Sequence, residues 1–129
     1  MAKKYCYFIN LCFISLFLLC AAQAMANDTE YNAGFLAAES GDYAQAVDKW
    51  GPLASSGHAM AQFNIALMYH GGLGVETNEA EAVKWYTLAA KNGYMPAQEF
   101  LSVAYQEGWF GLPQDEKQAR YWEQMAELR

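Results

Sequence analysis

The side chains of this sequence that could take part in chemistry are two histidines, a serine pair and a group of glutamates. The separation of His58 and His70 fits no metal-binding motif. The run Ser55-Ser56-Gly57-His58 ends a predicted helix, whereas a nucleophile elbow joins a strand to a helix. Three glutamates between positions 76 and 81 open another predicted helix, where acidic residues meet the helix dipole favourably. The sequence therefore predicts no catalytic residue, no metal ligand and no cofactor.

A glycine-rich run at Gly71, Gly72 and Gly74 lacks the context of a phosphate-binding loop. No predicted strand precedes it, and no Lys-Ser/Thr pair follows it. The run instead lets the chain turn between two helices. We therefore expect a non-catalytic protein. The alternative function is that of an enzyme acting on the cell wall or on β-lactams.

Positions 1–26 have the features of a secretory signal peptide. Lys3 and Lys4 give a positive start, and Leu11 to Ala22 is an apolar run interrupted by one serine. Small residues at Ala24 and Ala26 then predict cleavage after Ala26. The apolar run is shorter than the roughly 20 residues of a membrane-spanning helix. We therefore expect a periplasmic or secreted protein with no membrane insertion after signal removal.

All three cysteines lie within this predicted signal, at positions 6, 12 and 20. Cys20 raises the alternative of a lipoprotein signal, but Leu19 stands where the lipid-attachment motif requires a small residue. A retained, uncleaved anchor is the other alternative. Without cysteines after position 26, we expect no disulfide there and a stability that depends on packing.

The charge of residues 27–129 is strongly negative. Two of the eight basic residues lie in the predicted signal, which leaves six against 14 acidic ones and a net charge of −8. This balance argues against nucleic acid and anionic membrane surfaces as partners. It permits a basic protein partner, and it also suits simple solubility.

The chain after the signal predicts an all-α fold, because apolar residues recur at helical spacing and no strand-like alternation competes. Asp42, Asn78 and Asp115 are predicted N-caps, with Glu81 and Gln118 as reciprocal partners of the last two. Glycines mark the helix ends, and a proline in the second helix should kink or restart it. The six predicted helices span about 27–40, 43–55, 59–70, 79–91, 97–107 and 116–128.

A repeat with a period of about 36 residues organises these helices. Ala61-Gln62 recurs one period later as Ala97-Gln98. Trp85 recurs as Trp122 one position later than the period requires, because the second loop is longer. Helices repeated in this way predict an α-solenoid of about three antiparallel hairpins. The predicted organisation is a signal peptide at 1–26 and a repeat domain at 27–129, with hairpins at about 27–57, 58–93 and 94–129.

The small and aromatic residues within each copy carry a specific resemblance. Residues 41–57 read as a first half-repeat, residues 59–93 as a full copy and residues 97–126 as a second copy. This pattern resembles the Sel1-like repeat family, relatives of the tetratricopeptide repeats. Trp85 and Tyr86 would then belong to the scaffold. The matching positions of the full copy are Ala59, Ala61, Ile65, Ala66, Tyr69, Gly72, Gly74, Val75, Asn78, Glu81, Ala82, Trp85, Tyr86, Ala89, Ala90 and Gly93.

The resemblance implies a non-catalytic module that binds another protein. Some short, signal-bearing members resemble periplasmic immunity proteins that inhibit secreted toxic effectors such as lipases. An adaptor in cell-envelope signalling or assembly is the alternative. A cysteine-rich branch is linked to β-lactam binding, but residues 27–129 lack those cysteines. Glu123 and Glu127 depart from the aromatic and alanine of the pattern, as a polar terminal cap would.

Several apolar residues on the first helix of each hairpin are not required by the repeat pattern. In such solenoids this helix lines the concave surface, so Phe63, Leu67, Phe100 and Val103 would form a stripe that receives a partner segment. The alternative is that they pack against adjacent hairpins, because helical periodicity cannot assign faces so finely. Two aromatics in a glycine-bounded loop either contact a partner or fold back under the loop. The predicted partner-binding residues are Met60, Phe63, Asn64, Leu67, Glu99, Phe100, Val103, Gln106, Trp109 and Phe110.

Overall fold

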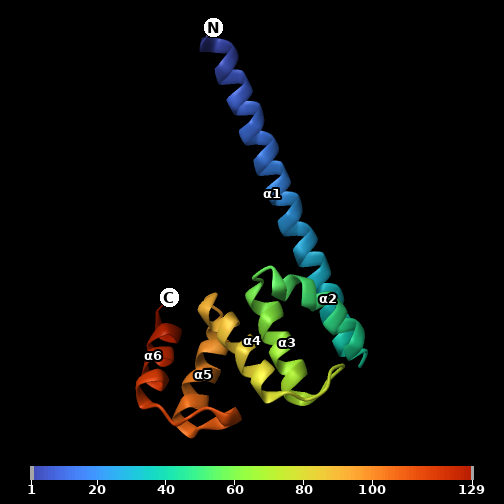
Figure 1. Cartoon of the computed structure of the whole chain (residues 1–129). Coiled ribbons are helices and arrows are strands. Elements are labelled where there is room, and N and C mark those ends of the chain that lie inside the picture. The colour runs from blue at the N-terminus through green and yellow to red at the C-terminus, as the bar shows by residue number, and fades with distance from the viewer. Residues whose placement is uncertain (1, 129) are drawn as a thin grey trace.

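Six α-helices pack as three hairpins in a row (Figure 1). The computed structural model describes the backbone of residues 2–128 and the side chains of residues 19–128. No strand occurs among residues 2–128, so the predicted all-α solenoid is confirmed. The helices are α1 (Ala2–Glu39), α2 (Tyr43–Ser55), α3 (Ala59–Gly71), α4 (Glu79–Lys91), α5 (Met95–Glu107) and α6 (Glu116–Glu127), with a short 3-10 turn η1 (Trp109–Gly111) before α6.

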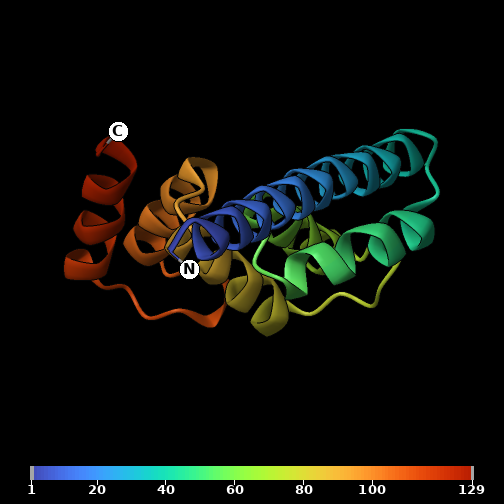
Figure 2. The same cartoon turned by 90° about the horizontal axis from the view of Figure 1, so that it is seen from above.

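The first helix is longer than the one predicted at 27–40. α1 continues unbroken from Ala2 to Glu39, and its N-terminal part extends away from the hairpins (Figure 1). Seen from above, α1 runs beside α2 at its C-terminal end (Figure 2). Cleavage after Ala26 and export stay predictions; the side chains of Lys3 and Lys4 lie outside the described residues. Within the described part, no helix has both the length and the apolarity needed to cross a membrane.

The predicted N-caps form. The Oδ1 atom of Asp42 accepts the Gln45 N–H at 3.0 Å, and that of Asn78 accepts the Glu81 N–H at 3.0 Å. Asp115 Oδ1 likewise accepts N–H groups of the first turn of α6, at 2.9 and 3.1 Å. Each cap satisfies donors that have no partner within the helix, which fixes where the helix begins.

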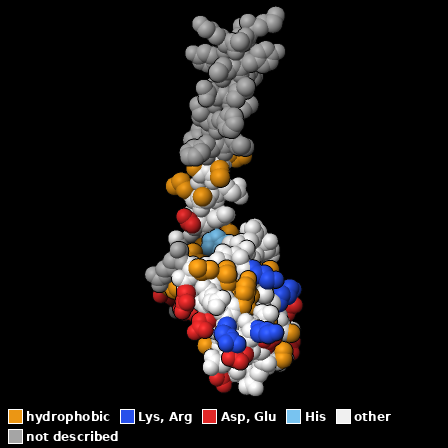
Figure 3. Space-filling view, turned by 90° about the vertical axis from the view of Figure 1, so that its left-hand side faces the viewer, with side chains coloured by type: hydrophobic (Ala, Val, Ile, Leu, Met, Phe, Trp, Pro, Cys, Tyr) orange, Lys and Arg blue, Asp and Glu red, His pale blue; other side chains and the backbone are white. Residues whose placement is uncertain are grey.

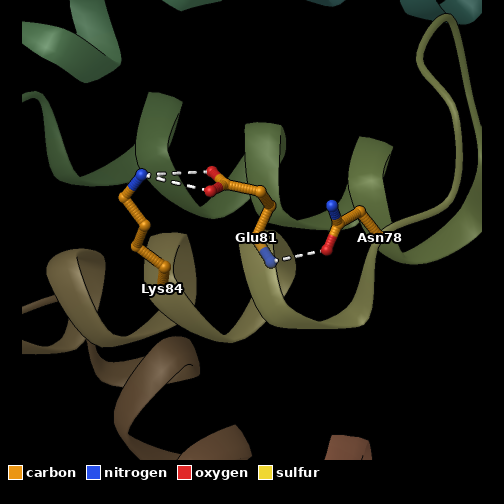
Figure 4. A network of polar contacts seen from close by, with 3 residues as sticks. All are labelled: Asn78, Glu81 and Lys84. Carbon is orange, nitrogen blue, oxygen red and sulfur yellow. Dashed lines mark hydrogen bonds and ion pairs between the residues drawn. The ribbon is translucent and has the colours of Figure 1, made fainter.

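The reciprocal half of the predicted capping boxes does not form within the described residues. The Asn78 N–H donates to the Tyr69 carbonyl at 3.0 Å, a bond made by the preceding helix. The Glu81 carboxylate is therefore not needed there and instead accepts from Lys84 Nζ at 3.2 Å (Figure 4). Gln118 is displaced in the same way, since the Asp115 N–H donates to a carbonyl at the end of α5 at 2.9 Å. Tertiary bonds replace the local ones that the sequence predicted.

Glycines end the second helix of a hairpin as predicted. Gly57 has φ +98°, and the His58 N–H returns to the Leu53 carbonyl at 3.0 Å, closing a left-handed C-terminal turn. α2 reaches Ser55 through Pro52, so Pro52 does not end the helix. α5 begins at Met95, slightly before the predicted start, because Pro96 lies in the first turn, where its missing N–H is not required.

Alanines form the contacts between helices. Nine alanines in α2 to α5 are at most 1 % exposed, which lets the helix backbones approach closely. The core has two parts, one around Trp50 and one around Tyr86, and Trp85 packs against both. Two buried glutamines tie each hairpin to the one before: Gln62 Nε2 donates to the Ala54 carbonyl and Gln98 Nε2 to the Ala90 carbonyl, both at 3.0 Å. Packing and these bonds hold three hairpins in one row.

Candidate functional site

The residues that could have done chemistry serve the scaffold. His58 is the N-cap of α3, because its Nδ1 accepts the Ala61 N–H at 3.2 Å, and its ring stacks on Tyr31 at 5.2 Å. His70 Nδ1 lies 3.3 Å from the Tyr86 hydroxyl. Among the described side chains, no group of three or more histidine, cysteine or acidic residues is arranged to hold a metal ion.

Two residues of the predicted stripe, Phe63 and Phe100, belong mainly to the core. The Phe100 ring stacks on Tyr86 with centroids 3.9 Å apart, and the Phe63 ring meets Tyr86 and Tyr94 at 5.4 and 5.1 Å. Both phenylalanines are half-buried. For these two residues the structure favours the alternative of packing against adjacent hairpins, and their partner contact stays a prediction.

Burial also changes the acidity of the phenols in this cluster. Tyr86 is 1 % exposed, and burial raises the pKa of its hydroxyl to about 12. Burial and, second, the phenol of Tyr31 raise the pKa of Tyr94. Both groups stay neutral at physiological pH, so the cluster offers no charged or nucleophilic atom.

The two loop aromatics separate. Phe110 folds back: its ring meets His70 at 4.6 Å and Phe100 at 5.5 Å, and its backbone adopts the left-handed φ of +55° to do so. Trp109 stays half-exposed beside Phe100, with centroids 6.5 Å apart. Trp109 alone therefore offers a large exposed ring from this loop.

The remaining predicted residues lie at the surface of α3 and α5. Leu67, Val103 and Met60 are exposed apolar side chains, while Glu99 and Gln106 are exposed and polar. Asn64 is instead tied to α1, because its Nδ2 donates to the Tyr31 hydroxyl at 3.1 Å. Contact of these residues with a partner stays a prediction.

A further exposed residue, Phe35 of α1, was missed from the sequence. Tyr31 packs against Trp50 and His58 as Phe63 packs against Tyr86 and Tyr94, so Tyr31 and Phe63 occupy equivalent places. Phe35 follows Tyr31 by one helical turn, as Leu67 follows Phe63. Val103 is the residue of α5 that stands one repeat period after Leu67. Phe35, Leu67 and Val103 are 48 %, 38 % and 40 % exposed. We call these three residues the apolar ladder.

The equivalence of Phe35 and Leu67 could have been found from the sequence by aligning the first helices of the hairpins and allowing for the different lengths of the loops that follow them. The turn between α1 and α2 is Ser40–Asp42, whereas the loop between α3 and α4 runs from Gly72 to Asn78. Because the first turn is shorter, Phe35 precedes Leu67 by less than one full period.

An open hollow of 460 Å³ lies beside this surface, between α5 and α6. Its lining combines apolar side chains with three glutamates and one serine: Met95, Glu99, Ser102, Val103, Glu123, Ala126 and Glu127. We call it the end groove. The face at the α6 end of the molecule shows apolar side chains among acidic and basic ones (Figure 3).

The family of the chain follows from comparison with known proteins. The Sel1 repeat profile matches residues 59–94 and 96–127, which together span more than half of the chain. The protein belongs to the Sel1 repeat family, as the sequence predicted, and repeats of this family bind other proteins.

Two solved structures share the fold. A Sel1 repeat protein from Oxalobacter formigenes is 37 % identical, with a TM-score of 0.60 over 65 % of this chain and 63 % of that one. A protective antigen of uropathogenic Escherichia coli strains is 38 % identical, with a TM-score of 0.69 over 83 % of this chain and 24 % of that one.

Curated relatives match over shorter stretches. The DAP3-binding cell death enhancer 1 of Rattus norvegicus is 39 % identical over 64 residues, which is 50 % of this chain and 13 % of that protein. The exopolysaccharide production negative regulator of Rhizobium meliloti is 36 % identical over 69 residues, which is 54 % of this chain and 26 % of that protein. The chain thus spans about a quarter or less of the length of these relatives.

Proposed function

We propose that this protein is an exported, non-catalytic module that binds a partner protein on the concave surface formed by the first helix of each hairpin. The observation that carries the proposal is the apolar ladder. Its three side chains recur at equivalent places in α1, α3 and α5 and are exposed, although their neighbours pack into the core. A row of exposed apolar side chains on successive repeats gains free energy when a partner covers it.

The narrower proposal is that the partner is a secreted toxic effector, such as a lipase, which the module inhibits. The sequence resemblance to periplasmic immunity proteins supports it, as do the small size and the negative charge of residues 27–129. The mechanism would be steric, because a rigid surface that covers an effector's active site needs no catalytic residue of its own.

A second candidate is an adaptor in cell-envelope signalling or assembly. The 36 % identity with the exopolysaccharide production negative regulator favours it, because the name of that protein gives it a regulatory role in exopolysaccharide production. Both candidates require a protein partner, and they differ in what the partner does.

The test compares two leucines of similar exposure on different helices. Leu67 belongs to the apolar ladder and is 38 % exposed, whereas Leu88 lies on α4 and is 36 % exposed. Purified wild-type protein, Leu67→Glu and Leu88→Glu are immobilised and exposed to cell-envelope extract, and the retained proteins are quantified by mass spectrometry. We expect one protein to be retained by the wild type and Leu88→Glu and lost with Leu67→Glu.

Equal retention by all three proteins would contradict binding on the ladder. When a partner is retained, adding the module to that partner separates the two candidates. Loss of a hydrolytic activity supports the inhibitor, whereas a partner without such activity supports the adaptor.

A further inference from the structure

The end groove lies where the structure, one repeat earlier, seats a helix. α5 and its N-cap residue Tyr94 pack in the corresponding place against the preceding hairpin, mainly against α4. Three side-chain contacts show how. The Tyr94 ring meets Phe63 at 5.1 Å, the Phe100 ring meets Tyr86 at 3.9 Å, and Gln98 Nε2 reaches the Ala90 carbonyl at 3.0 Å. The groove therefore stands at the position that receives a helix one repeat earlier, and residues 2–128 place no helix there.

The residues that receive α5 are replaced in the end groove by glutamate. One period after Phe63 stands Glu99, and Glu123 and Glu127 follow Tyr86 and Ala90 when the longer loop is counted. Two lining positions stay apolar, since Val103 and Ala126 follow Leu67 and Ala89 at the same offsets, while Ser102 follows the buried Ala66. The end groove thus differs from the site that holds α5 mainly by three added negative charges.

The three carboxylates have no ion-pair partner among residues 19–128. The ion pairs of that part of the chain use Glu30, Glu81 and Glu116 instead. A neutral apolar helix laid over the groove would bury carboxylates without compensation, which is costly. A helix with Lys or Arg at the facing positions would neutralise them while its small apolar residues cover Val103 and Ala126.

We propose that the end groove binds a basic amphipathic helix of the partner protein, in the place that α5 occupies one repeat earlier. A second copy of this chain fits poorly, because it would bring more negative charge to an acidic surface. The inference rests on the proposed protein-binding function and names the chemistry of the partner segment.

A synthetic peptide provides the probe. It carries residues 94–107 with Tyr94→Lys, Gln98→Arg and Phe100→Lys, so that each position equivalent to an α5 contact presents a cation to a glutamate. The control peptide carries Glu at the same three positions. Binding to the full chain is measured by fluorescence anisotropy at low and at physiological salt.

Two triple variants of the protein supply matched controls. The groove variant carries Glu99→Gln, Glu123→Gln and Glu127→Gln. The charge-matched variant carries Glu39→Gln, Glu76→Gln and Glu107→Gln at exposed positions outside the lining of the groove. Because all six glutamates are exposed, we expect both variants to keep the wild-type circular dichroism spectrum.

We expect saturable binding of the basic peptide, weakened about tenfold by the groove variant and less than about twofold by the charge-matched variant. The control peptide should not bind. Absence of saturable binding below about 1 mM, equal loss in both variants, or equal binding of the two peptides would overturn the inference. Dimerisation of the wild type that the groove variant abolishes would also overturn it, by assigning the groove to a second copy.

The inference and the proposed function fail separately. If the natural partner loses affinity with Leu67→Glu but not with the groove variant, protein binding on the apolar ladder stands and the basic-helix inference is wrong. If neither change affects any partner, the proposed function itself fails.

Discussion

Truncating Tyr86 to alanine should destabilise the protein strongly, because this ring lies between the second and third hairpins. Tyr86 is 1 % exposed and contacts the rings of Phe63 and Phe100. Truncating a buried aromatic side chain to alanine costs about 3–5 kcal/mol, and a domain of this size has only about 5–15 kcal/mol in total. Tyr86→Phe keeps the ring and loses one hydrogen bond to His70, which should cost about 1 kcal/mol.

The assay is urea unfolding followed by far-ultraviolet circular dichroism and by tryptophan fluorescence. Tyr86→Ala should lower the urea midpoint strongly, and Tyr86→Phe should lower the unfolding free energy by about 1 kcal/mol. Trp109→Ala, which removes a half-exposed ring, serves as the control and should change stability little. If the unfolding free energy of Tyr86→Ala lies within about 0.5 kcal/mol of the wild type, as for a surface substitution, the assignment of this ring to the scaffold is refuted.

Three further predictions concern stability. His58→Ala should cost about 1 kcal/mol by removing the N-cap acceptor of α3, and His58→Asn, which keeps an acceptor, should cost less in the same unfolding assay. Gly74→Ala should cost about 2–4 kcal/mol, because Gly74 has φ +70° and an added Cβ would lie 2.5 Å from the Tyr43 carbonyl oxygen. The control Gly57→Ala also has a positive φ, but its Cβ would meet no neighbour within 4 Å, so it should cost only about 1–2 kcal/mol. Equal losses of unfolding free energy in the two variants would contradict the close contact at Gly74. The pKa of Tyr86 is about 12 in the folded state and ordinarily 10.0, so the unfolded chain loses this proton first as pH rises. The unfolding free energy should therefore fall by about 2–3 kcal/mol between pH 10 and pH 12. Tyr86→Phe should lack this fall when urea midpoints are compared between pH 9 and pH 12.

The helices could be predicted because their ends are encoded locally. Asp42, Asn78 and Asp115 are caps that act on the residues next to them, and Gly57 closes a turn that other residues adopt only with strain. The repeat added the order of the helices, since residues separated by one period must occupy equivalent places.

The partners of the capping residues could not be predicted, because they lie outside the local segment. The N–H of Asn78 is taken by the carbonyl of Tyr69, which the loop brings to it. From the spacing in the sequence, the Glu81 side chain is the expected acceptor of the Asn78 N–H, because it is only three residues away. A tertiary contact displaced the local one.

The candidate site was predicted less well than the fold, for a reason of geometry. Phe63 and Leu67 are one helical turn apart, yet Phe63 is half-buried against Tyr86 and Leu67 is exposed. Which of these two residues faces the next hairpin depends on the angles at which neighbouring helices cross, and these angles cannot be read from the sequence. Phe35 was missed because the shorter first turn makes its offset from Leu67 smaller than the repeat period.

The central claim is that the apolar ladder binds a protein, and the dissociation constant of the purified partner tests it most directly. Isothermal titration calorimetry compares the wild type, Leu67→Glu and the control Leu88→Glu. A charge placed in the centre of a covered apolar contact costs about 2 kcal/mol or more, so Leu67→Glu should weaken binding about 30-fold or more. Leu88→Glu should bind as the wild type does. Equal dissociation constants for the three proteins would contradict the assignment of the binding surface.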